Sequence, residues 1–142
     1  MIIIIGRIIS YLPLRIPKMC YNTAKKGLLP MMPELEVVTL DEIQNEIANE
    51  LGVMLYFSGI HCNVCHALRP KVKALFDEHF PEIKQRYIDA ENSPEVAAHY
   101  NVFAVPTMIV FMDRREFARE GRAVSLVQLR EKLQRPYGMM TE

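Results

Sequence analysis

The sequence predicts an α/β domain built on a central mixed β-sheet with helices on both faces. Short, nearly continuous apolar runs of strand length alternate along the chain with longer segments whose apolar residues recur at helical spacing. The last two strand-like runs are joined by a short turn and should pair antiparallel, whereas strands joined through a helix can be parallel. A strand-rich core that alternates with helices implies a sheet covered on both sides.

The composition fits one globular domain. The chain has 142 residues, of which 50% are hydrophobic and 24% are charged. Its 17 basic and 17 acidic residues give a formal net charge of zero, so the charge gives no support for nucleic-acid binding. Three cysteines are too few for a disulfide scaffold.

The charges divide the chain into two parts. Residues 1–30 hold five basic and no acidic side chains, which leaves 12 basic and 17 acidic for residues 31–142. Prolines interrupt the first part, and it has no apolar run near the roughly 18 residues that span a bilayer. We therefore expect residues 1–33 to be a non-core extension, residues 34–137 to form the domain, and residues 138–142 to be a tail.

Other interpretations of the first 30 residues stay open. They could form a weak membrane-surface or export segment, or an ordered element docked on the domain. We predict a cytoplasmic protein, with membrane association or export through residues 1–30 as the alternative. Cys20, which lies in this segment, is interpreted as an incidental thiol.

The first expected helix spans residues 40–51. Thr39 and Glu42 form a capping-box pattern ahead of apolar residues at helical spacing, and Gly52 suits the exit from the helix. Residues 34–38 are expected to form a short edge strand before it.

The central stretch runs from residue 53 to residue 70. A buried strand of apolar residues breaks at Ser58-Gly59, and a helix then begins near Cys62 and continues to about His79. Its expected apolar face consists of Val64, Leu68, Val72 and Leu75. Pro70 falls inside this helix and should kink it.

The remaining elements follow in turn. We expect a strand over residues 85–89, a helix with Ser93 as N-cap and Pro94 at its first position, and a strand over residues 108–112. A turn at residues 113–115 leads into an antiparallel strand over residues 116–120. Ser125 should begin the last helix, which Pro136 and Gly138 are expected to end.

Cys62 and Cys65 are the residues most capable of chemistry. The C-x-x-C spacing places the first cysteine at a helix N-terminus and the second one turn inside, where unpaired N–H groups and the helix dipole favour an anion. Such a position lowers the pKa of a thiol below its usual value of about 8.5. We therefore expect Cys62 to attack a disulfide as the nucleophile and Cys65 to resolve the mixed disulfide.

Three other interpretations of this motif are open. The cysteines could be half of a zinc site with His61 and His66, but consecutive residues at a helix start point in different directions. Cys62 to His66 also matches the C-x-x-C-H haem attachment pattern. Finally, the pair could be a degenerate remnant in a protein-binding adaptor.

Four landmarks in order resemble the thioredoxin family. They are the strand followed by C-x-x-C, the helix proline Pro70 eight residues later, Val105-Pro106-Thr107 ahead of a strand, and Gly121 after the final hairpin. The resemblance covers about residues 37–134 and implies the thioredoxin fold. It also implies a cis peptide before Pro106, beside the cysteines, and pairing of the Val105 backbone with an extended substrate. We assign substrate contact also to Ile60 and His61.

The sequence departs from the family's usual pattern near the cysteines. His61 and Asn63-Val64 stand where members commonly carry tryptophan and Gly-Pro, and Tyr56 stands where a buried aspartate is often found. The chain therefore resembles a divergent thioredoxin-like protein. His61, His66 and Tyr56 are the candidates for tuning the thiol pKa values, Tyr56 being foremost a core aromatic.

We accordingly expect a thiol–disulfide oxidoreductase that reduces protein disulfides and serves cell redox homeostasis. No bound cofactor and no metal are needed, because the electrons reside in the cysteine pair. The resemblance implies a thioredoxin-reductase-like electron donor, and we expect a monomer. The alternative is a thioredoxin-fold adaptor whose thiols are incidental.

Overall fold

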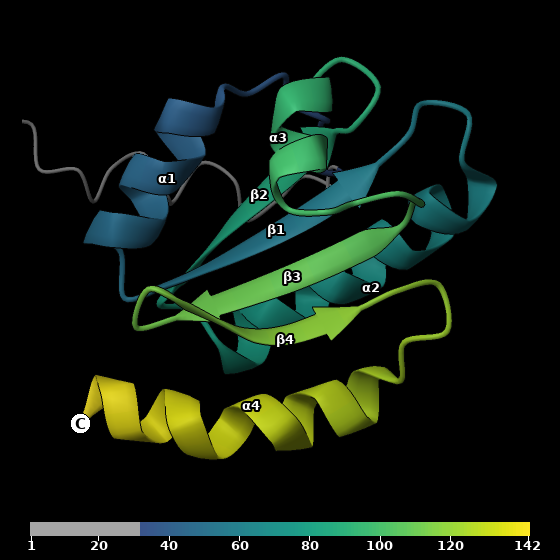
Figure 1. Cartoon of the computed structure of the whole chain (residues 1–142). Helices are drawn as coiled ribbons and strands as arrows, with labels where there is room; N and C mark the ends of the chain where they lie inside the picture. The colour runs from purple at the N-terminus through teal and green to yellow at the C-terminus, as the bar shows by residue number, and fades with distance from the viewer. Residues whose placement is uncertain (1–31) are drawn as a thin grey trace, which may run out of the picture. The chain divides into compact units, whose positions relative to one another are not determined.

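The computed structural model describes residues 32–142 (Figure 1). The expectations for residues 1–31, including the incidental role of Cys20, lie outside these residues. In chain order the elements are α1 (Leu40–Asn49), β1 (Gly52–Ser58), α2 (Asn63–His79), β2 (Ile83–Asp89), α3 (Pro94–His99), β3 (Thr107–Met112), β4 (Arg115–Glu120) and α4 (Leu126–Thr141).

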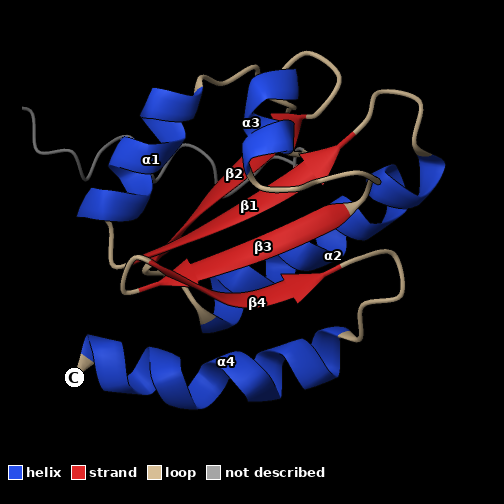
Figure 2. Cartoon of the chain, in the orientation of Figure 1, coloured by secondary structure: helices blue, strands red, loops and turns tan. Residues whose placement is uncertain are grey.

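The four strands form one mixed sheet in the order β2-β1-β3-β4 (Figure 2). Strand β1 pairs parallel with β2 and antiparallel with β3, and β3 pairs antiparallel with β4. Asp113 and Arg114 both adopt positive φ in the tight turn between β3 and β4, as a two-residue hairpin requires. The expected edge strand is reduced to a single parallel bridge between Glu36 and Ile88.

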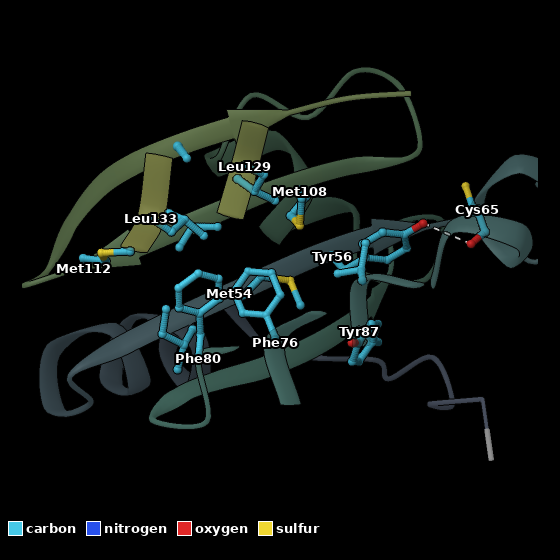
Figure 3. Packing of buried hydrophobic residues seen from close by; sticks show 14 residues of the cluster. Met54, Tyr56, Cys65, Phe76, Phe80, Tyr87, Met108, Met112, Leu129 and Leu133 are labelled. Carbon is cyan, nitrogen blue, oxygen red and sulfur yellow. Dashed lines mark hydrogen bonds between the residues drawn. The ribbon is translucent and has the colours of Figure 1, made fainter. Parts of the chain in front are cut away.

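The sheet has a hydrophobic core on each face, because successive side chains of a strand point to opposite sides. Met54 and Tyr56 of β1 belong to the cluster covered by α2 and α4 (Figure 3). Val53, Leu55 and Phe57 belong to the cluster on the other face, covered by α1 and α3. The predicted mixed sheet with helices on both faces is confirmed.

Both predicted N-cap residues stand at their helix starts, but only Thr39 caps its own helix through its side chain. The Thr39 hydroxyl accepts a hydrogen bond from the Glu42 N–H at 3.3 Å at the start of α1. Ser93 does occupy the N-cap of α3, but its hydroxyl accepts from the N–H of Val38 at 3.1 Å rather than from its own helix. Ser93 therefore joins α3 to the segment before α1.

The predicted exit of α1 at Gly52 is wrong, because the helix ends at Asn49 and Gly52 opens β1. A Cβ at Gly52 would lie 3.0 Å from Cγ1 of Ile83 and 3.2 Å from the Phe111 carbonyl oxygen. The glycine is thus required by close strand packing and not by a helix terminus.

The predicted end of α4 at Pro136 and Gly138 is also wrong, since the helix continues to Thr141. Tyr137 holds the extension: its ring meets that of Phe80 edge to face at 5.1 Å. Its hydroxyl also accepts a hydrogen bond from the Glu82 N–H at 3.2 Å. These tertiary contacts outweigh the one helix hydrogen bond that proline removes.

Arg86 of β2 fixes the edge of the sheet to α1. Its buried guanidinium forms ion pairs with Glu36 and Glu42, each at 2.7 Å, and with Glu46. Three carboxylates therefore surround this one buried cation. Among residues 32–142, no helix has the length and apolar character needed to cross a membrane.

Candidate active site

Cys62 is the N-cap of α2. Its Sγ accepts a hydrogen bond from the backbone N–H of Cys65 at 3.2 Å, and its carbonyl oxygen accepts from the N–H of His66 at 3.1 Å. In the reduced protein the same N–H would face a thiolate, and the positive end of the helix dipole would add to its stabilisation. The backbone of the first turn thus forms a site for a sulfur anion.

Cys62 and Cys65 form a disulfide, with an S–S distance of 2.17 Å and a Cα–Cα distance of 5.2 Å. Cys65 is fully buried in the cluster beneath α2, whereas Cys62 is half-buried. The outer sulfur is therefore the one that a substrate could reach, and the inner sulfur is positioned to attack it from behind.

The Val105–Pro106 loop lies next to the outer cysteine. The peptide bond before Pro106 is cis, as the family resemblance implied, and the Val105 carbonyl oxygen lies 4.0 Å from Cys62 Sγ. A Cβ at Gly59 would lie 3.6 Å from a Val105 methyl and 3.8 Å from Cys62 Cβ. The loop, the cysteine and the end of β1 thus meet around Gly59, at ordinary van der Waals distances.

Tyr56 lies beneath the cysteine pair, in the buried cluster. Its hydroxyl donates a hydrogen bond to the Cys65 carbonyl oxygen at 3.0 Å (Figure 3). Burial raises the pKa of this hydroxyl to about 12, although the charge of Arg69 lowers it somewhat. Tyr56 thus keeps its proton at neutral pH, and the arrangement favours a structural donor over a proton acceptor for Cys65.

Tyr56 should also make the protein lose stability in alkali. Because its pKa rises from 10 to about 12 on folding, the unfolded chain ionises first, and stability should fall as pH rises from 10 to 12. The slope from this one residue is about 1.4 kcal/mol per pH unit. Burial raises the pKa of Tyr87 in the same direction.

Urea unfolding between about pH 8 and 11.5 measures this effect. We expect the Tyr56→Phe variant to lose about 1 kcal/mol at pH 8, from the missing hydrogen bond, and to show a shallower fall above pH 10. Equal slopes in the variant and the parent protein would contradict the assignment.

His66 is held by both ring nitrogens. Nδ1 lies 3.0 Å from an Nη of Arg69, and Nε2 lies 2.8 Å from the carbonyl oxygen of Ile60. A guanidinium only donates, so Nδ1 accepts and the ring proton sits on Nε2, from which it is donated to Ile60. His66 is therefore in the neutral tautomer, and the cation on this side of the helix is Arg69.

The other predicted site residues lie at the surface. His61 is exposed, and Ile60 is 51% exposed. Phe103, which our sequence analysis left out of the site, is 89% exposed two residues before Val105. An aromatic residue in the loop ahead of a predicted substrate-binding proline was the signal that could have found it.

Arg69 is the second residue that the sequence analysis missed. The expected apolar face of α2 was Val64, Leu68, Val72 and Leu75, but the buried positions are Cys65, Arg69, Val72 and Phe76. Spacings of four, three and four from Cys65 would have placed Arg69 on the buried stripe. Because a charged side chain is not expected on a buried helix face, the sequence pattern did not place Arg69 there.

The alternatives for the motif gain no support from the geometry. No group of three or more His, Cys, Asp or Glu residues within the described range could hold a metal ion. Both ring nitrogens of His66 are engaged, and the two sulfurs are bonded to each other.

Comparisons with known proteins agree with the family resemblance seen in the sequence. The family model described as Thioredoxin matches residues 34–135. The thioredoxin-like protein YdfQ of Bacillus subtilis is 40% identical over 99 residues, covering 70% of this chain and 88% of YdfQ. Thioredoxin of Chlamydia trachomatis is 33% identical over 85 residues, covering 60% and 81% respectively.

Solved structures agree with the fold. Mitochondrial thioredoxin 3 from Saccharomyces cerevisiae, in its oxidized form, superposes with a TM-score of 0.62 at 22% identity, covering 72% of this chain and 93% of that one. Fasciola hepatica thioredoxin gives a TM-score of 0.58 at 29% identity, covering 72% and 98%.

Proposed function

Because the chain belongs to the thioredoxin family and is a thiol–disulfide oxidoreductase, we propose that it reduces disulfides in proteins, with Cys62 as nucleophile and Cys65 as resolving thiol. The observation that carries this assignment is the difference in burial within the pair. Only Cys62 is accessible, and only Cys62 receives the N-terminal N–H of α2. The redox-active disulfide itself serves as the electron carrier, so no cofactor takes part.

The reaction proceeds in two exchanges. The Cys62 thiolate attacks one sulfur of the substrate disulfide, a Cys62–substrate bond forms, and the other substrate sulfur leaves as a thiolate that takes up a proton. Cys65 then gives up its proton and attacks Cys62 Sγ, which forms the Cys62–Cys65 disulfide and releases the second substrate thiol. Two electrons pass to the substrate together with one proton from Cys65 and one from the solvent, and a dithiol reductant must restore the reduced pair.

Substrate contact is assigned to the surface around Cys62. The half-buried Val105 offers backbone groups beside the sulfur, where an extended segment could pair with them. The exposed side chains of Ile60, His61 and Phe103 lie in the two loops that meet there. Two large apolar groups on this surface favour substrates with apolar residues near their disulfide.

The electron donor in this proposal is a thioredoxin-reductase-like enzyme. The protein acts as a monomer, and residues 34–137 form its thioredoxin-like domain. A cytoplasmic location fits the reductant role, because thiols are kept reduced there. Membrane association or export through residues 1–30 is the alternative location.

Reduction of insulin disulfides with dithiothreitol as electron source tests the proposal. We expect turnover above the dithiothreitol background, and loss of that turnover in Cys62→Ser. Cys20→Ser is the matched control and should keep full activity. A protein without turnover under any dithiol reductant would instead be an adaptor, and the proposal would be wrong.

A further inference from the structure

Arg69 is a buried cation on the same face of α2 as the inner cysteine. The residue is only 4% exposed, and it follows Cys65 by four positions, one helical turn. Side chains of a helix point toward its N-terminus, so the guanidinium extends back toward the cysteine pair. Its contact with His66, the residue next to Cys65, confirms this direction.

No carboxylate compensates this charge in the described part of the chain. The guanidinium donates to the carbonyl oxygen of Pro33 at 2.9 Å and to His66 Nδ1 at 3.0 Å, and its Nε has no partner. Arg86, the other buried arginine, is surrounded by three glutamates. Burying a charge without an ionic partner costs stability, so this arrangement is unfavourable for the fold alone.

The charge of Arg69 acts on the groups beneath the cysteines. It lowers the pKa values of the Tyr56 and Tyr87 hydroxyls, against the larger effect of burial. The Tyr56 hydroxyl bonds the Cys65 carbonyl, and His66 bonds the Ile60 carbonyl in the loop before Cys62. Arg69 is therefore joined by hydrogen bonds, through His66, to the loop before Cys62, and its charge acts on the Tyr56 hydroxyl that bonds the Cys65 carbonyl.

We propose that Arg69 is a positioning residue for the redox reaction, whose uncompensated buried charge stabilises the anionic, reduced form of the Cys62–Cys65 pair. Through His66 it also holds the loop that carries Ile60. This inference rests on the proposed function, because it concerns a residue that sets the redox equilibrium of the same cysteine pair.

The electron balance gives the direction of the effect. The oxidised pair is neutral; it takes two electrons and one proton from a dithiol or two glutathione molecules and becomes one thiol and one thiolate. A nearby cation favours the product of that reaction over the reactant. Arg69 should therefore make the pair easier to reduce and more oxidising toward its partners.

The equilibrium of the purified full-length protein with glutathione redox buffers measures this directly. In Arg69→Met we expect the equilibrium constant for reduction of the pair to fall about tenfold, or about 30 mV. The absorbance titration of the Cys62 thiolate should shift to higher pH. Arg69→Lys keeps the charge and should restore most of both values.

Thermal unfolding of the oxidised variants separates this role from a structural one. Arg69→Met should be at least as stable as the parent, because it removes an unpaired buried charge. Arg86→Met is the matched control: it should lower the unfolding temperature, because the largely buried Glu46 then keeps only its ion pair with Lys84. It should leave the glutathione equilibrium unchanged. Arg69→Gln, which keeps donors but no charge, should behave as Arg69→Met and replaces it if that variant does not fold.

An unchanged glutathione equilibrium in Arg69→Met or Arg69→Gln would overturn the inference, as would a lower stability with an unchanged equilibrium. The measurement needs no protein substrate. If insulin is not reduced but the equilibrium shifts as expected, the proposed substrate class is wrong and the role of Arg69 stands.

Discussion

Replacing Cys65 with serine should leave the protein covalently attached to its substrates. Cys62 can still attack a disulfide, but no second thiol lies behind it to release the mixed disulfide. Well-oriented intramolecular groups reach effective molarities of about 10⁵ M or more, so millimolar external thiol cannot replace Cys65 and turnover should fall by at least roughly a thousandfold. Non-reducing electrophoresis and mass spectrometry of the adduct measure the result.

The controls assign each sulfur its role. The experiment is done in a Cys20→Ser background, so that the only free thiol of the variant is Cys62. Cys62→Ser in the same background should trap little substrate, because Cys65 is fully buried. Adducts that form through Cys65 and not through Cys62 would reverse the proposed roles of nucleophile and resolving thiol.

Replacing Phe76 with alanine should cause the largest loss of stability in the protein. Phe76 is fully buried on the inner face of α2, and its ring lies 5.5 Å from that of Phe80 within the cluster that also contains Cys65 (Figure 3). Phenylalanine-to-alanine changes in a core cost about 3–5 kcal/mol, a large part of a typical folding free energy of about 5–15 kcal/mol. Urea unfolding of the oxidised protein measures the change.

The same substitution at Phe103 is the matched control. Its side chain is 89% exposed, so the loss should stay within about 0.5 kcal/mol. Phe76→Leu should lose about 1.5 kcal/mol or less and remains measurable if the alanine variant is unfolded. Similar losses at Phe76 and Phe103 would show that α2 is not anchored through this ring.

The parts of the site that could be predicted from the sequence are those set by local backbone structure. A cysteine after a buried strand and a Ser-Gly break is positioned as an N-cap by the same rules that place Thr39 and Ser125. The motif Val105-Pro106-Thr107, which follows C-x-x-C in the chain, supported the resemblance to the thioredoxin family, and that resemblance implied the cis peptide bond before Pro106. These signals span only a few residues each, so a single sequence contains them.

The wrong predictions for the end of α4 and for Gly52 arise from long-range packing, which local sequence does not show. Pro136 and Gly138 weaken a helix locally, but Tyr137 holds α4 together through Phe80 and Glu82, residues more than 50 positions away. Gly52 fits a helix exit locally, yet it is required by contacts with two neighbouring strands. Local preferences of about 1 kcal/mol per residue for glycine, and about 3 for proline, are overcome by such packing.

The sequence by itself determined the mixed α/β fold and the redox pair at a helix N-terminus, because both depend on short-range rules, and its resemblance to the thioredoxin family implied the cis-proline loop. Only the tertiary structure decided the environment of that pair: Tyr56 donating to the Cys65 carbonyl, neutral His66, and Arg69 buried without a carboxylate. A charge acts over distance through a medium whose polarity depends on everything packed around it. No short segment of the sequence specifies these surroundings. The redox chemistry could therefore be predicted from the motif, whereas the electrostatic environment of the cysteines is defined only in the folded structure.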